Sequence, residues 1–168
     1  MTTEVTQANE ENVFEAPQAD LGVHSGNKPI LEFKRFSAWG VFLLGIVTLG
    51  LYYIYWVYNR SQKTNALSQN KKASLISIYI VIACLIGLIS LPFVFVDQQT
   101  IANAEGIINL VYFIAWIVAI FSLRSAIAEI INMSGEDAEP VYLNGILTFF
   151  FSAIYIQYKI NEAIDNQS

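Results

Sequence analysis

Long apolar runs separated by short charged segments dominate the pattern along this chain. Four runs contain no charged residue and lie at about 36–59, 73–96, 106–123 and 140–158. Because a helix rises about 1.5 Å per residue, roughly 20 residues cross the ~30 Å hydrocarbon core of a bilayer. The first two runs exceed that length, and the last two are at its lower limit. The pattern therefore predicts an all-α integral membrane bundle with four hydrophobic helical segments.

The first and fourth runs resemble each other at an offset of 100 positions. Eight residue types coincide, namely Val41, Leu43, Gly45, Ile46, Thr48, Ile54, Tyr55 and Tyr58 with Val141, Leu143, Gly145, Ile146, Thr148, Ile154, Tyr155 and Tyr158. Self-similarity at a fixed offset is typical of repeated structural units. We therefore predict that 36–59 and 140–158 form an internal repeat with similar folds.

Positive charge leaves two topologies open for these segments. If all four runs span, Lys28, Lys34, Arg35 and Lys159 face one side, and Arg60, Lys63, Lys71, Lys72 and Arg124 face the other. If the repeated segments are re-entrant hairpins, all nine bases lie on one side, as the positive-inside rule expects. Gly45 and Gly50 would suit a turn in the first copy, whereas the second keeps only Gly145. A turn inside hydrocarbon survives only where protein buries it.

The two ends of the sequence differ in character. Residues 1–30 are polar and acidic, which predicts a disordered tail, because so few apolar residues cannot offset the entropy of ordering. The only histidine, His24, lies in this tail. Residues 31–168 form the expected membrane domain. The first 30 residues lack a basic start followed by an apolar run, so we expect no signal peptide.

Two polar and aromatic stripes are the candidate functional residues. Spacings of three and four place each set on one helical face; the sets are Tyr55, Tyr58, Gln62 and Asn65 in the first copy and Tyr155, Tyr158, Glu162 and Asp165 in the second. They are explained either as solvated helix ends with interfacial tyrosines or as two faces that meet over a shared headgroup or partner.

The sequence offers little reactive chemistry. The apolar runs contain no ionisable acid or base, although proton relays and coupled transporters usually need one inside the membrane. Cys84 lies within an apolar run, where a thiol is inert. The acidic cluster Glu136, Asp137 and Glu139 lacks a histidine and is read as a solvated connector. We expect no enzyme, no cofactor, no metal site and no nucleic-acid partner.

Residues 43–67, LLGIVTLGLYYIYWVYNRSQKTNAL, resemble a bacterial membrane family known as domain of unknown function 4234. The shared pattern is Thr48-Leu49-Gly50, then Tyr52, Tyr55-Trp56 and Asn65, and the resemblance covers about residues 34–96. The second copy departs from it at Phe149-Phe150 and Ile156. The family implies a multi-pass bacterial membrane protein, in the cytoplasmic membrane, and brings no activity.

Three functions remain compatible with these features. The first is a membrane scaffold or accessory subunit that contacts a membrane protein partner or a second copy of itself. The second is a protein that binds anionic lipid headgroups through the aromatic and basic belt around Tyr52–Lys63. The third is a small channel or carrier for an uncharged solute, lined by Thr48, Tyr55, Tyr58 and their copies. For all three functions we expect the protein to be embedded in a lipid bilayer.

Overall fold

The computed structural model describes residues 28–134 and 140–167, and within these ranges the chain is helical without strands. A short 3-10 helix, η1, precedes five α-helices; the bounds are Pro29–Glu32 (η1), Ala38–Val47 (α1), Leu51–Leu67 (α2), Leu75–Val94 (α3), Gln98–Ser134 (α4) and Gly145–Asp165 (α5). The described residues do not include most of the predicted tail or any of the acidic cluster Glu136, Asp137 and Glu139. Pro29 and Ile30 were assigned to the tail, but they are buried in η1.

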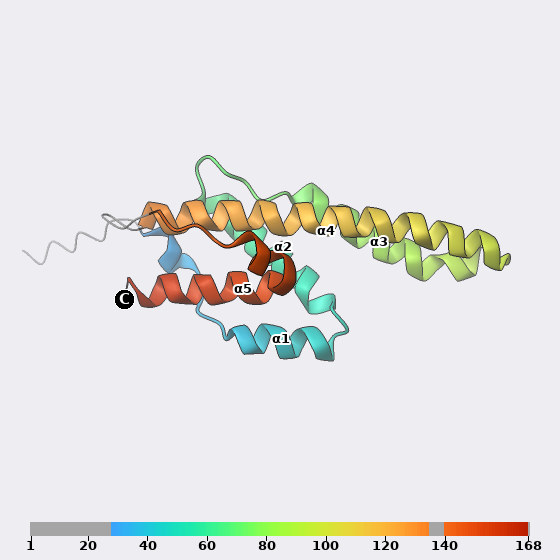
Figure 1. Ribbon diagram of the computed structural model, residues 1–168, viewed down its shortest axis with the longest axis horizontal. Coiled ribbons are helices and arrows are strands. Elements are labelled where there is room, and N and C mark those ends of the chain that lie inside the picture. Colours follow the sequence, from blue (N-terminus) through green and yellow to red (C-terminus); the bar gives the residue numbers. More distant parts are fainter. Residues whose placement is uncertain (1–27, 135–139, 168) are drawn as a thin grey trace, which may run out of the picture.

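Helices α3 and α4 lie side by side and form the long arm of the molecule (Figure 1). Both are long and apolar enough to cross a membrane. The charged segment 97–105 between the second and third apolar runs reads as a loop in the sequence, but this prediction is wrong, because α4 begins at Gln98 and continues for 37 residues. Asp97 explains this start: its Oδ2 accepts hydrogen bonds from the backbone N–H and the hydroxyl of Thr100 at 2.8 and 2.7 Å, which caps the first turn.

The first repeated segment is a helical hairpin and not one long helix. Leu49 and Gly50 have positive φ angles of 51° and 90° between α1 and α2. The turn satisfies its own backbone, since the Thr48 hydroxyl donates to the Leu44 carbonyl at 2.7 Å and accepts from the Tyr52 N–H at 2.9 Å. Lys63 near the end of α2 donates to the Glu32 carbonyl before α1. The segment therefore leaves at the end where it entered.

The second repeated segment also breaks in its middle. Asn144 caps α5 by accepting from the N–H groups of Ile146 and Leu147. Ser152 then interrupts the helix with φ 39° and ψ −115°. Val141 before the break and Glu162 after it line one cavity, so this segment too returns to its starting end. Its origin as a duplicate of the first segment stays a prediction.

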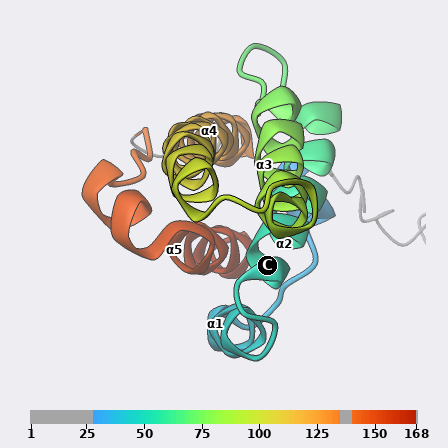
Figure 2. The same ribbon diagram turned by 90° about the vertical axis from the view of Figure 1, so that its right-hand side faces the viewer.

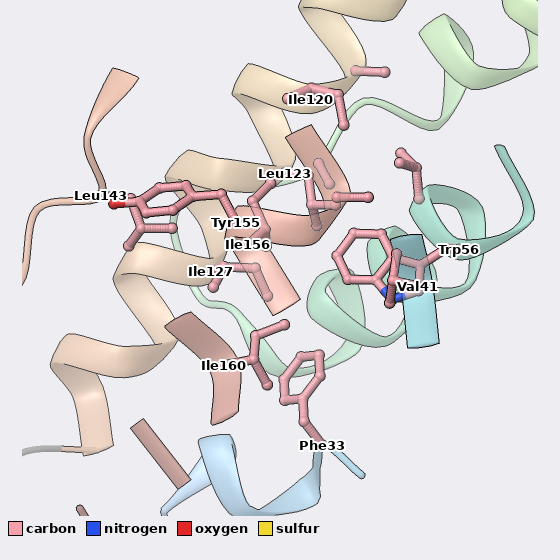
Figure 3. Packing of buried hydrophobic residues seen from close by; sticks show 14 of the residues in the cluster. Phe33, Val41, Trp56, Ile120, Leu123, Ile127, Leu143, Tyr155, Ile156 and Ile160 are labelled. Carbon is pink, nitrogen blue, oxygen red and sulfur yellow. The ribbon is translucent and has the colours of Figure 1, made fainter. Parts of the chain in front are cut away.

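The core lies where the two broken segments pack against α4. In the end-on view, α5 lies between α4 and α1 (Figure 2). Leu123 and Ile127 of α4 meet Ile156 and Ile160 of α5, and all four side chains are fully buried (Figure 3). Trp56 of α2 packs at the edge of this cluster. Much of α3 and the first part of α4 expose apolar side chains instead, as lipid-facing helices do.

Candidate functional site

A chain of hydrogen bonds centred on the buried Gln157 connects the two broken segments. Gln157 of α5 is fully buried, and its Oε1 accepts from Trp56 Nε1 at 3.1 Å and from the Arg60 guanidinium at 3.0 Å. Its Nε2 donates to Asn161 Oδ1 at 2.8 Å. Asn161 Nδ2 in turn donates to the Phe36 carbonyl at 2.7 Å, just before α1. These bonds hold the entry of α1 and the end of α2 against α5.

Arg60 is the charged member of this network and is only 8% exposed. Its guanidinium donates to Gln157 and to the Lys34 carbonyl, which are both neutral acceptors. It also lies 5.7 Å from the ring centroids of Phe33 and Trp56. Burial lowers the pKa of Arg60 from its ordinary value. Among the described residues no carboxylate forms an ion pair with Arg60, although a buried cation is costly without a counter-charge.

Arg60 lines an open pocket of about 530 Å³ that we call the basic pocket. Its wall combines four bases with four aromatic side chains and one amide, namely Lys34, Arg35, Arg60, Lys63, Phe36, Tyr52, Tyr55, Trp56 and Asn59. Arg35 pairs with Asp165 of α5 at 2.9 Å, on an exposed part of the surface. Lys63 donates to a backbone carbonyl and lies over the Phe33 ring. The pocket thus carries more positive than negative charge.

The four residues of the first stripe lie on α2 and contact several different neighbours. Tyr55 is exposed and lines the basic pocket. Tyr58 accepts from Gln62 Nε2 at 2.7 Å and packs on the Tyr79 ring of α3. Asn65 bonds the backbone of Ala73 through both its amide atoms and so closes the loop between α2 and α3.

The stripe of the second copy has other partners. The Tyr155 hydroxyl accepts from the Asn144 N–H at 2.9 Å, across the break in α5. Lys159 lies over the Tyr158 ring and pairs with Glu162 at 2.5 Å, while Asp165 pairs with Arg35. The buried polar contacts between α2 and α5 therefore run through Trp56, Arg60 and Gln157, which lie outside the predicted stripes.

Sequence reasoning missed Gln157 and Arg60 as a pair. One signal was available: Gln157 is the amide in the otherwise apolar and aromatic stretch 153–158, at the position that matches Val57 in the first copy. A buried amide needs partners, so it points to a polar neighbour. The neighbour itself depends on how α2 and α5 cross, which the spacing of residues along one helix does not give.

Within the residues that the structure describes, no group of three or more His, Cys, Asp or Glu side chains could hold a metal ion. Cys84 is half-buried in α3. The basic pocket is therefore the described site with the clearest chemistry, and that chemistry is recognition of an anion by Arg and Lys next to aromatic rings.

These features define a helical protein with two helices long enough to cross a membrane and two broken helical segments beside them. The family model described as Domain of unknown function (DUF4234) matches residues 36–129, and the chain belongs to that family. The match extends beyond the expected 34–96 and includes α3 and most of α4. The searches of curated proteins and of solved structures found no match.

Proposed function

We propose that this protein is an integral membrane protein that binds the anionic headgroup of a phospholipid in the basic pocket. In this arrangement α3 and α4 span the bilayer, and the α1–α2 and α5 segments are re-entrant hairpins that open to the same side. All nine Lys and Arg residues then lie on one side, which the positive-inside rule makes cytoplasmic. We further propose the cytoplasmic membrane of a bacterium as the location.

The buried Arg60 carries the proposal. A buried cation with only neutral hydrogen-bond acceptors is stabilised when an anion binds next to it and supplies the counter-charge. The open pocket gives an anion access to Arg60. Lys34 and Lys63 add charge at the same pocket. Tyr52, Tyr55 and Trp56 form an amphipathic wall, of the kind that concentrates at the level of lipid headgroups. This wall favours a lipid over a free phosphate ion.

Topology is the first half of the test. Cysteines placed at exposed Gln69, Gln98 and Asn166 in a Cys84→Ala background would be labelled with a membrane-impermeant thiol reagent in intact and broken cells. The proposal expects Gln69 and Asn166 on one side and Gln98 on the other. If Gln98 and Asn166 share a side opposite Gln69, all four segments span and the proposed arrangement is wrong.

Lipid selectivity is the second half. We expect phosphatidylglycerol to raise the melting temperature of the detergent-solubilised protein more than phosphatidylcholine or inorganic phosphate does, because ligands that bind the folded state stabilise it. Lys34→Gln with Lys63→Gln should abolish most of the difference. Lys28→Gln with Lys71→Gln removes the same charge outside the pocket and is the matched control. Equal losses in both pairs would indicate unspecific surface attraction.

The other two functions stay predictions. A scaffold or accessory subunit would need a stoichiometric partner or a second copy, which co-purification would reveal. A pathway for an uncharged solute would need Thr48, Tyr55 and Tyr58 to line it. In the structure the Thr48 hydroxyl forms hydrogen bonds within the turn between α1 and α2. Tyr58 accepts a hydrogen bond from Gln62 and packs on the Tyr79 ring.

A further inference from the structure

The breaks in the two repeated segments meet at one pocket. Its volume is about 300 Å³, and its wall includes residues of both breaks and of α4, namely Gly50, Phe150, Phe151, Ser152, Tyr112 and Trp116. We call it the break pocket. Gly50 has φ 90°, and a Cβ built on it would meet no atom within 4 Å, so this residue leaves open space. Ser152 is a non-glycine residue at φ 39°, a backbone conformation that persists only where its surroundings hold it.

The break pocket lies deep in the bilayer under the proposed membrane placement, on which this inference rests. Tyr112 and Trp116 are near the centre of the uncharged stretch of α4 between Glu105 and Arg124. They are seven and eight residues from those charges, which corresponds to about 10–12 Å along a helix. Water that solvates the charged ends therefore does not reach this level through the lipid.

Four polar side chains line the break pocket, namely Tyr53, Tyr112, Trp116 and Ser152. Within residues 28–134 and 140–167, no hydrogen bond joins any of these side chains to another group, including the Trp116 indole N–H and the Ser152 hydroxyl. An unpaired donor in hydrocarbon is unfavourable, and lipid tails offer no acceptor. Filling the pocket with a molecule that has an oxygen acceptor would satisfy the indole N–H and the Ser152 hydroxyl.

The lining also restricts the charge and shape of that molecule. No Asp, Glu, Lys, Arg or His is among the lining residues, so a charged ligand would be buried without a counter-charge. Five aromatic rings, from Tyr53, Tyr112, Trp116, Phe150 and Phe151, offer flat apolar contact. Discontinuous helices around a pocket near the bilayer midplane are also how membrane proteins build solute sites.

We propose that the break pocket is a binding site for a small uncharged molecule that carries a hydrogen-bond acceptor. The acceptor oxygen binds at Trp116 and Ser152, and the body of the molecule lies against the aromatic rings. This site is separate from the basic pocket: it is lined by other residues, and it takes a neutral ligand.

Acrylamide is a suitable probe because it is small, uncharged, carries a carbonyl acceptor and quenches tryptophan. Trp39→Phe removes the exposed tryptophan, and the buried Trp56 stays as a common background. The difference in fluorescence between the Trp39→Phe variant and the Trp39→Phe/Trp116→Phe double variant isolates the emission of Trp116. The matched control adds Ile114→Trp to that double variant, since Ile114 lies at the same depth on α4 and is exposed to lipid.

In liposomes we expect acrylamide to quench Trp116 several-fold more strongly than the tryptophan at position 114, and iodide to quench neither. If Trp116 is as shielded as position 114, the proposed site is wrong. If acrylamide quenches both positions strongly, the membrane placement fails, and with it the proposal that depends on it.

A second measurement does not depend on the folding of the Trp116 variant. Ser152→Cys in a Cys84→Ala background should react with uncharged N-ethylmaleimide and resist a cationic methanethiosulfonate. Ile114→Cys is its control at equal depth and should react slowly with both reagents. Equal rates for N-ethylmaleimide at positions 152 and 114 would contradict the site.

Discussion

Trp56 and Gln157 are 101 positions apart in the chain and share a buried hydrogen bond of 3.1 Å. The same Gln157 oxygen accepts from Arg60, so one amide oxygen accepts from an indole and a guanidinium of α2. This contact couples the end of the first hairpin to the second. It also explains how a charged residue is held under the basic pocket by neutral partners.

Gln157→Leu is expected to destabilise the protein by about 3 kcal/mol, because it leaves the buried Arg60 and Trp56 donors without their acceptor. Thermal unfolding in detergent would measure the loss. Gln157→Glu is the informative counterpart: it keeps the acceptor and supplies a counter-charge. We expect this variant to fold and to lose the stabilisation by phosphatidylglycerol. Full retention of that stabilisation would contradict the role of Arg60.

Gly45 and Gly145 lie 100 positions apart and match in the predicted repeat, but they have different surroundings. A Cβ on Gly45 would overlap the Tyr53 ring, which packs directly on this glycine and holds α1 against α2. A Cβ on Gly145 would be 3.7 Å from Phe121, which is an ordinary contact. We therefore expect Gly45→Ala to cost about 1–3 kcal/mol and Gly145→Ala to be neutral or slightly stabilising.

Denaturant unfolding of the two alanine variants in the same detergent would test this difference. Gly45→Ala/Tyr53→Leu should recover part of the loss, because the smaller side chain makes room for the added methyl group. Equal effects of the two single alanine variants would show that the packing of Tyr53 on Gly45 does not matter for the hairpin.

The two breaks should respond in opposite ways to changes in backbone freedom. Gly50→Ala places a side chain at φ 90° and is expected to cost about 1 kcal/mol or more. Ser152→Gly relieves a non-glycine residue at φ 39° and should leave stability unchanged or raise it. Melting temperatures of the two variants would test this, and a large loss for Ser152→Gly would indicate that its side chain stabilises the break.

The α3–α4 connection is expected to respond to acid. A side-chain hydrogen bond from Thr100, helped by its backbone N–H, lowers the pKa of Asp97. A carboxyl with a lowered folded-state pKa contributes stability above its ordinary value near 4, and this contribution is lost as the pH falls through the folded-state pKa. Thr100→Val should therefore reduce the pH dependence of the melting temperature between about pH 5 and 3. An unchanged dependence would show that other carboxylates dominate it.

The pattern of apolar and polar residues was enough to predict an all-helical chain, because the length and spacing of the apolar residues in each segment are visible in the sequence of that segment alone. The spacing of the first stripe also predicted that the helix continues past the apolar run as far as Asn65, and α2 does so. The family was recognisable from the Thr48–Asn65 pattern. The start of α4 was misplaced by the acids at Asp97 and Glu105, since charge alone does not separate a loop from a capped helix end.

The sequence by itself thus determined the helical class, the apolar segments and the residues able to anchor at an interface. The tertiary structure was needed to show that both segments fold back. Glycine marks the first break at position 50, whereas Ser152 has no such mark in the sequence and takes its positive φ angle beside residues of the first hairpin and α4. The tertiary structure also decided which polar residues act together. Gln157 and Arg60 meet only where two helices cross, and no periodicity within one helix encodes that crossing.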